Sequence, residues 1–92
     1  MPQLRKIYFS KVFAKNYKNR IQLNKKLQSR YVKVFDLFLK DPYRPSLKNH
    51  KLQGSQRTFR AISIASDCRL IYFEDSRGIW LIDIGTHKQV YS

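Results

Sequence analysis

Acidic residues are scarce in this chain of 92 residues, which carries 6 Asp+Glu against 19 Lys+Arg and has a formal net charge of +13. No acidic residue precedes Asp36, although ten lysines and arginines do. Residues 1–60 hold a charge balance of +14, and residues 61–92 hold a balance of −1. Because such an excess of one sign repels itself in a compact domain, the composition predicts a polyanionic partner.

Cysteine, glycine and long apolar runs are also sparse. The single cysteine, Cys68, excludes an internal disulfide framework and is typical of a reducing compartment, so we expect a cytoplasmic protein. The longest apolar runs span four residues, 70–73 and 79–82, and predict neither a transmembrane helix nor a secretory signal. The three glycines, Gly54, Gly78 and Gly85, stand alone, which excludes a glycine-rich phosphate loop.

The first half of the chain predicts a strand followed by two helices in a single domain over residues 1–92. The strand covers Arg5–Phe9, and Ser10 is the expected N-cap of a first helix. Asn19 and Gln22 have the spacing of a capping box and predict a restart of the helix after a bend. Pro42 and Pro45 end the second helix and open a loop that runs to about Gly54.

Apolar spacing supports both helices and identifies their buried side. In the first helix, apolar residues recur every four positions. In the second, they recur at i, i+4, i+7, i+8 and i+11. We expect the larger of these side chains, together with Trp80, to form core and not ligand contacts. The residues concerned are Phe13, Tyr17 and Ile21, then Leu27, Tyr31, Val34, Phe35 and Phe38.

The second half alternates with period two and predicts three strands, Arg57–Ile64, Cys68–Phe73 and Ile79–Ile84. The order β-α-α-β-β-β indicates an α+β fold, in which a pair of helices packs on one face of a mostly antiparallel sheet. With 74–78 as a five-residue loop, Phe73 faces Ile79. That register places Arg69 directly across from Asp83, which would then hold its guanidinium.

No metal-ligand spacing and no nucleophile motif is present, but polar groups cluster at the ends of the predicted strands. Two histidines and one cysteine lie far apart in the sequence, without C-x-x-C or H-x-x-x-H spacing, so we expect neither a metal nor another cofactor. This combination of histidine, arginine, aspartate and tyrosine side chains suits cleavage of RNA by its own 2′-hydroxyl. That reaction needs a base, an acid and cations around phosphorus. The residues are His50, Arg60, Asp67, Arg69, His87 and Tyr91.

Five short motifs in this order resemble the RelE/ParE toxin superfamily, and within it the YafQ-like branch of bacterial mRNA interferases. The resemblance is specific over residues 47–92 and only architectural over 1–46. The motifs are H-K-L-Q-G at 50–54, F-R at 59–60, D-C-R-L-I-Y at 67–72, D-I-G-T-H at 83–87 and V-Y at 90–91.

The resemblance implies a RelE-like domain that enters the ribosomal A site, cuts mRNA on the 70S ribosome and is silenced by a cognate antitoxin. It implies that His50 and His87 are catalytic, and that Asp67 is an acidic residue of the active site. It also implies that Arg69 binds the scissile phosphate and that Tyr91 stacks on or orients the substrate. Beside this set, we expect Arg60, Lys51 and Lys88 to bind the RNA backbone.

Two positions depart from the branch, and plainer roles remain open. Ser63 stands where the pattern has a further catalytic histidine, and Cys68 where it has a tryptophan. Serine cannot replace histidine as an acid or base at neutral pH, so activity could be weakened or lost. His50 can also be a loop residue bonded to the backbone, and Asp67 a turn former. Other functions that remain open are a ParE-like gyrase toxin and a non-catalytic protein that binds ribosomal RNA.

Overall fold

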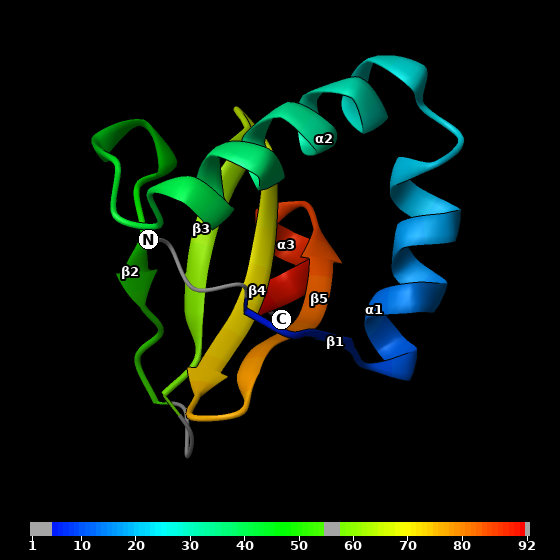
Figure 1. Cartoon of the computed structure of the whole chain (residues 1–92). Coiled ribbons are helices and arrows are strands. Elements are labelled where there is room, and N and C mark those ends of the chain that lie inside the picture. The colour runs from blue at the N-terminus through cyan, green and yellow to red at the C-terminus, as the bar shows by residue number, and fades with distance from the viewer. Residues whose placement is uncertain (1–4, 55–57, 92) are drawn as a thin grey trace.

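The computed structural model describes residues 5–54 and 58–91, and within them a five-stranded sheet in the order β1-β5-β4-β3-β2. The strands are β1 (Ile7–Phe9), β2 (His50–Lys51), β3 (Arg60–Ala65), β4 (Cys68–Asp75) and β5 (Gly78–Gly85). β1 runs parallel to β5, and the other three pairings are antiparallel. The α+β class and the mostly antiparallel sheet are therefore confirmed (Figure 1).

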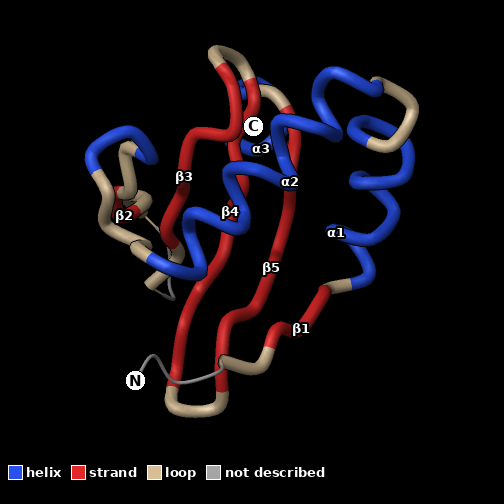
Figure 2. Tube along the Cα trace, turned by 45° about the horizontal axis from the view of Figure 1, so that its top comes forward, coloured by secondary structure: helices blue, strands red, loops and turns tan. Residues whose placement is uncertain are grey.

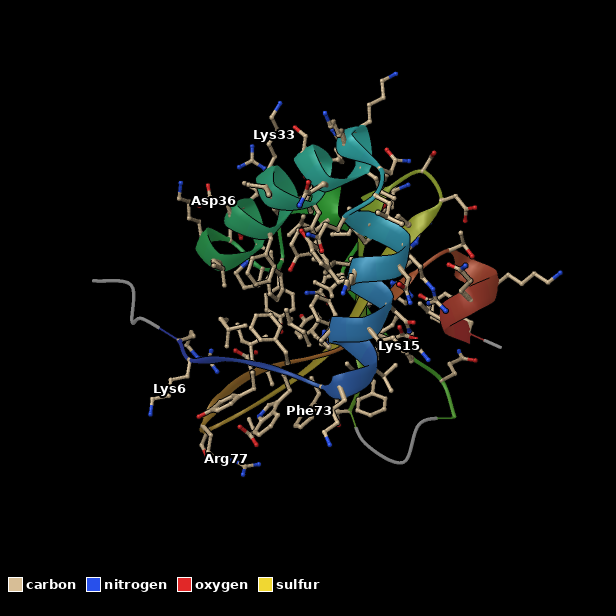
Figure 3. All side chains as sticks on the ribbon, turned by 90° about the vertical axis from the view of Figure 1, so that its right-hand side faces the viewer. Lys6, Lys15, Lys33, Asp36, Phe73 and Arg77 are labelled. Atoms are coloured by element: carbon tan, nitrogen blue, oxygen red, sulfur yellow. The ribbon has the colours of Figure 1, made fainter. Side chains whose placement is uncertain are left out.

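Helices cover both faces of the sheet. α1 (Lys11–Asn16) continues into a π-helical turn, η1 (Tyr17–Ile21). α2 (Lys25–Lys40) then crosses the sheet (Figure 2). A short 3-10 turn, η2 (Pro45–Leu47), precedes β2, and α3 (His87–Tyr91) ends the described chain. α2 and α3 lie on opposite sides of the sheet (Figures 1 and 3). We call the sheet face opposite α2 the back face.

The N-cap predicted at Ser10 is confirmed, but the predicted restart of the helix at Asn19 is wrong. The Ser10 side chain accepts a hydrogen bond from the Phe13 N–H at 2.9 Å. Asn19 instead lies inside η1, where the Gln22 N–H reaches back to the Tyr17 carbonyl at 2.9 Å. α2 is capped by Asn24, which accepts from the Leu27 N–H at 3.1 Å.

The π turn follows from the apolar spacing of this segment. In a regular α-helix, each four-residue step drifts by about 40° around the axis. A run at strict four-residue intervals would therefore wind away from the core. The wider π turn slows this rotation and returns Ile21 to the interior, where it is 0% exposed.

The core lies between α2 and the sheet. Tyr31, Val34 and Phe38 face it from α2, as predicted, and Phe35 packs against its margin. From the sheet come alternate residues of β3, β4 and β5, because side chains of a strand alternate between faces. These are Ile62 and Ile64, then Cys68, Leu70 and Tyr72, then Ile79 and Leu81, with Ile84 after a bulge.

Trp80 was expected in this core, but it lies on the back face and is only partly buried. It follows Ile79 and precedes Leu81, both of which point toward α2, so the pleat turns the indole the other way. There it stacks on Tyr8 at 4.2 Å and on Phe73 at 5.8 Å between ring centroids. The Arg77 guanidinium lies 4.9 Å from the indole centroid.

The predicted register of the β4–β5 hairpin is also wrong. β4 extends to Asp75 and β5 begins at Gly78, so only two residues form the turn and Phe73 pairs with Trp80. The Asp75 carboxylate closes this turn by accepting from the Arg77 N–H at 2.9 Å and the Gly78 N–H at 3.3 Å. Asx side chains close turns in this way.

A bulge then shifts the upper half of the hairpin by one more residue. Tyr72 pairs with Leu81, but Ile71 pairs with Asp83 and Arg69 with Gly85. The predicted contact between Arg69 and Asp83 is therefore absent from the described structure. Asp83 instead accepts from Asn16 at 2.7 Å and lies 3.6 Å from Arg20, both on the α1–η1 segment.

The remaining boundaries differ by a few residues. β3 begins at Arg60, whereas the predicted strand began at Arg57, which lies outside the described residues. The loop predicted from Pro42 to Gly54 contains η2 and β2. Among residues 5–54 and 58–91, no helix combines the length and the apolar character needed to cross a membrane.

Candidate active site

Arg69 lies at the start of β4 on the back face, between Ser63 of β3 and Gly85 of β5. Its Nη1 donates to the carbonyls of Ala65 at 2.9 Å and Cys68 at 3.2 Å. Within the described part of the chain, Arg69 has no acidic partner. Neutral carbonyls thus fix the guanidinium while its positive charge stays uncompensated, as binding of a phosphate requires.

α3 brings two predicted residues to the same end of the back face. His87 and Tyr91 are four residues apart on this short helix, and their rings meet edge to face at 4.3 Å between centroids. The His87 N–H points to Asp67 Oδ1 at 3.4 Å, which ties the start of α3 to the β3–β4 turn. Asp67, Arg69, His87 and Tyr91 therefore lie together.

The Tyr91 hydroxyl is the unusual group of this cluster. Its oxygen is buried and has no hydrogen-bond partner among the described residues. Burial raises the pKa of Tyr91, and the nearby positive charge of Arg69 opposes that shift. The hydroxyl is thus a neutral group near the Arg69 guanidinium, and its proton is donated to no described residue.

α3 itself was not predicted, although the sequence carries a signal for it. Thr86 and Gln89 form a reciprocal capping box, in which Gln89 Oε1 accepts from the Thr86 N–H at 2.8 Å and Thr86 Oγ1 accepts from the Gln89 N–H at 3.2 Å. The pattern T-x-x-Q is a known helix start. It begins α3 at His87 and fixes where that side chain stands.

His50 also lies on the back face, but on the edge strand β2, two strands away from Arg69. β2 pairs His50 with Ala61, and β3 pairs Ala61 with Ile71, so these three share the back face. His50 and Arg69 are two strands and two residues apart, which corresponds to about 12 Å between their Cα atoms. Between the two positions, Ala61 and Ile71 are 0% and 3% exposed, so this part of the back face is buried.

The hydrogen bond of His50 fixes its tautomer. Nδ1 lies 2.9 Å from the Lys48 carbonyl. A carbonyl only accepts, so Nδ1 carries the proton, and in the neutral ring Nε2 is left with its lone pair. The imidazole is exposed. His50 therefore combines the backbone contact expected of a loop residue with the lone pair that a general base needs.

Two of the three residues predicted to bind the RNA backbone, Arg60 and Lys51, lie away from this group of side chains. Arg60 projects to the α2 side of the sheet, where its Nε donates to Asn49 at 2.7 Å and its guanidinium lies 5.2 Å from the Tyr43 ring centroid. Lys51 pairs with Arg60 and is exposed on that same side. Lys88 is exposed on α3 beside His87. Of the three, only Lys88 lies beside the group formed by Asp67, Arg69, His87 and Tyr91.

Ser63 and Cys68 have local roles. Ser63 Oγ donates to the Ala65 carbonyl at 3.2 Å and lies 3.5 Å from Arg69 Nη1, so it supports the arginine. Burial raises the pKa of the Cys68 thiol to about 11, with Arg69 lowering it and Asp67 raising it more weakly. At neutral pH, Cys68 is a packed, protonated thiol.

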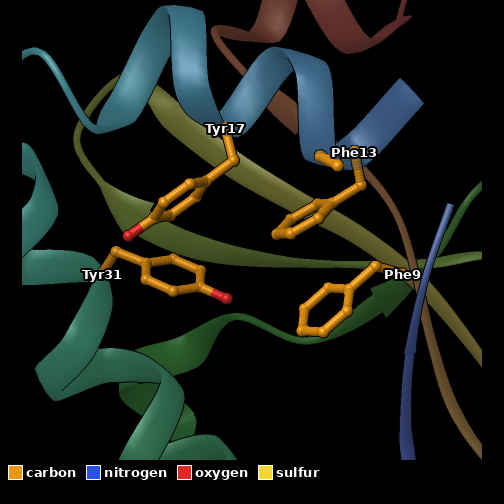
Figure 4. A pocket seen from close by; sticks show the side chains of 5 residues that line it. Phe9, Phe13, Tyr17 and Tyr31 are labelled. Carbon is orange, nitrogen blue, oxygen red and sulfur yellow. The ribbon is translucent and has the colours of Figure 1, made fainter. Parts of the chain in front are cut away.

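Residues outside the back face form an aromatic pocket of about 410 Å³, lined by Phe9, Phe13, Ala14, Tyr17 and Tyr31 (Figure 4). Phe9 and Phe13 stack at 5.5 Å, and Tyr17 meets Tyr31 edge to face at 5.1 Å. Phe9 is 62% exposed, so the pocket is open to solvent.

In the described parts of the chain, no three His, Cys, Asp or Glu side chains gather where they could hold a metal ion.

The chain is similar to known toxins in sequence and in fold. Residues 5–92 match the sequence model of a family described as "Bacterial toxin of type II toxin-antitoxin system, YafQ". YafQ from E. coli strain BL21(DE3) superposes with a TM-score of 0.81 at 24% identity over 97% of this chain and 100% of its own. The crystal structure of the E. coli DinJ-YafQ complex gives the same values.

A metal-bound toxin from Helicobacter pylori superposes with a TM-score of 0.73 at 27% identity, over 95% of this chain and 99% of its own. No curated protein matches the chain. The fold is that of bacterial toxins, since it also matches a YoeB/ParE toxin from Agrobacterium tumefaciens with a TM-score of 0.72 at 13% identity, over 89% of this chain and 98% of its own. The chain belongs to the YafQ family of type II toxin-antitoxin toxins.

Proposed function

We propose that this toxin is an endoribonuclease that cuts mRNA on the 70S ribosome, in the bacterial cytoplasm and without a metal ion. The observation that carries the proposal is the gathering of Asp67, Arg69, His87 and Tyr91 at one end of the back face. His50 faces this group across the sheet. These side chains supply a base, an acid and a cation, which are the parts that transesterification of RNA needs.

In the proposed reaction, His50 Nε2 takes the proton of the 2′-hydroxyl, and the 2′-oxygen attacks the adjacent phosphorus. The bond from phosphorus to the 5′-oxygen breaks, and His87 donates the proton that this leaving oxygen needs. The products are a 2′,3′-cyclic phosphate and a 5′-hydroxyl end. Arg69 and the Tyr91 hydroxyl donate to the phosphoryl oxygens, where negative charge grows.

Asp67 acts as a positioning residue in this proposal. Its carboxylate holds the N-terminal end of α3 through the His87 N–H. Ser63 supplies no acid or base, and it supports Arg69 instead. The chain therefore works with two histidines and with charge stabilisation by arginine.

The test is induced expression in bacteria, with mapping of mRNA ends. We expect growth arrest and cuts within codons on translated messages, and we expect both to disappear with His87→Ala. Arrest accompanied by DNA damage and intact mRNA would favour a gyrase toxin. Growth without arrest would favour a non-catalytic protein that binds ribosomal RNA.

We also propose that a cognate antitoxin neutralises this chain, as the E. coli DinJ-YafQ complex suggests. The antitoxin is acidic and partly disordered when free, and it places apolar side chains in the aromatic pocket. Lys11 and Lys15 complement its charge, because they lie on α1, the helix that supplies Phe13 and Ala14 to the pocket. Phe9→Lys should abolish rescue by the co-expressed antitoxin while leaving the growth arrest intact. Unchanged rescue would place the antitoxin elsewhere.

A further inference from the structure

A second cationic feature lies between α2, the η2 turn and the end of β3. It is a hollow of about 520 Å³, which we call the cationic groove, and its volume is in the range of sites that hold small ligands. Four cations line it: Arg30 and Lys33 from α2, and Arg44 and Lys48 from the two sides of η2.

None of these four cations has an acidic partner among residues 5–54 and 58–91. Arg30 Nε donates to the carbonyl of Ile64 at 3.1 Å, which fixes its guanidinium against the sheet without neutralising it. Lys33, Arg44 and Lys48 are exposed. Four like charges around one hollow repel each other, and a bound anion would relieve that repulsion.

The groove exists because the edge of β3 is only partly covered. β2 pairs with β3 at Arg60 and Ala61 alone, so no strand of the described structure covers the outer edge from Ile62 to Ala65. α2 and η2 flank this edge with basic side chains. The sequence scatters the four cations over residues 30–48, and the tertiary structure gathers them.

The groove adjoins the candidate active site. Ser63 and Ser66 line it, and both also contact Arg69, since Nη1 lies 3.5 Å from Ser63 Oγ and 3.5 Å from the Ser66 carbonyl. The groove and the phosphate-binding arginine therefore share a wall made by the β3–β4 turn. An RNA strand that runs from Arg69 around the β3–β4 turn would therefore enter the groove directly.

We propose that the cationic groove binds the sugar-phosphate backbone of the mRNA strand next to the scissile phosphate. This inference rests on the proposed ribonuclease function. Lysine and arginine charges position a backbone without reading its sequence, and the exposed Ser66 side chain adds a hydroxyl donor for phosphate or ribose oxygens. An acidic peptide is the less suitable occupant, because the open aromatic pocket that would hold its apolar side chains lies elsewhere.

The test uses the whole protein and non-cleavable, fully 2′-O-methylated RNA of 3 or 12 nucleotides, with affinity measured by fluorescence anisotropy at several salt concentrations. The groove variant combines Lys33→Gln, Arg44→Gln and Lys48→Asn. Asparagine at 48 suits the left-handed backbone there, where φ is 52°. The control combines Lys11→Gln, Lys15→Gln and Lys18→Gln, which removes three exposed charges from the α1–η1 segment, none of which lines the groove.

We expect the groove variant to bind the 12-mer about tenfold or more weakly than the wild type, with the salt slope reduced by about 2 for three lost contacts to single-stranded RNA. Binding of the trinucleotide, which reaches only Arg69, should change less than twofold. The control should lose distinctly less affinity for the 12-mer. Equal losses in the groove variant and the control would overturn the proposal.

Two further measurements separate other occupants and other failures. Weaker binding to empty 70S ribosomes with unchanged 12-mer affinity would assign the groove to ribosomal RNA and overturn the proposal. Weaker binding to the antitoxin alone would assign it to a protein and also overturn it. Failure of the wild type to cut mRNA would refute the ribonuclease function, whereas the oligonucleotide affinities test the groove separately.

Discussion

The backbone N–H of His87 lies 3.4 Å from Asp67 Oδ1, so the first residue of α3 is tied to the turn between β3 and β4. Arg69 starts β4 just after this turn, and its Nη1 donates to the Ala65 carbonyl at 2.9 Å just before it. The turn thus sets the position of the proposed acid relative to the proposed phosphate-binding group.

This contact predicts different outcomes for two substitutions of Asp67. Asp67→Ala removes the acceptor and should lower mRNA cleavage about tenfold, the value of one hydrogen bond to a charged group. Asp67→Asn keeps an oxygen acceptor and should retain most of the activity. Cleavage of a translated message at fixed toxin concentration measures both. Equal, large losses in the two variants would instead mean that the negative charge takes part in the reaction.

Tyr91→Phe should separate stability from activity. The hydroxyl oxygen is buried without a partner among the described residues, so its removal should leave the free energy of unfolding unchanged or raise it by about 1 kcal/mol. Cleavage should fall, because a donor to the phosphate is lost. Urea denaturation and message cleavage provide the two readouts. A loss of stability in Tyr91→Phe would show that the hydroxyl is satisfied in the folded protein.

The capping box of α3 should matter to cleavage more than to overall stability. Thr86→Ala or Gln89→Ala should weaken α3 by about 1 kcal/mol, and because the two side chains cap each other, the double variant should cost less than the two single variants together. Cleavage should fall in each, since His87 and Tyr91 depend on α3. Ser29→Ala, at an exposed position of α2, is the matched control and should leave cleavage unchanged.

The Cys68 thiol predicts a loss of stability at alkaline pH. Burial raises its pKa from 9.0 to about 11 in the folded chain. Between these values the unfolded state loses the proton first, so the folded state is progressively destabilised as the pH rises from 9 toward 11. At pH 10 the effect is about 1 kcal/mol. Burial also raises the pKa of Tyr31 and Tyr72, whose effect begins above their ordinary value of 10.0.

Denaturation at pH 8.5 and at about pH 10 measures this difference for the wild type and Cys68→Ala. The variant is less stable overall, but its loss between the two pH values should be smaller. The same loss in both proteins would show that the thiol does not carry the effect.

The fold class and much of the site were predictable because they depend on local patterns. Apolar periodicity gave the strands and helices, and the Ser10 N-cap was correct because a cap is a contact within one turn. The motif resemblance named the residues that the back face gathers. α3 was not predicted, but it could have been, since the capping box of Thr86 and Gln89 is a local pattern.

The register of the β4–β5 hairpin could not be predicted from the sequence, for a physical reason. Whether Arg69 faces Asp83 or Gly85 depends on a two-residue turn closed by Asp75 and on one extra residue in β5. A shift of one residue moves every side chain of a strand to the other face. The sequence also did not show that the pleat turns Arg60 away from the back face and toward Asn49.

The sequence by itself determined the charge, the order of the elements and the residues with suitable chemistry, because these are properties of composition and local spacing. Only the tertiary structure decided which of them meet. It joined α3 to the β3–β4 turn, left part of the outer edge of β3 without a partner strand among the described residues, and gathered four cations beside that edge. Such meetings depend on long-range packing and strand register, which local patterns do not encode.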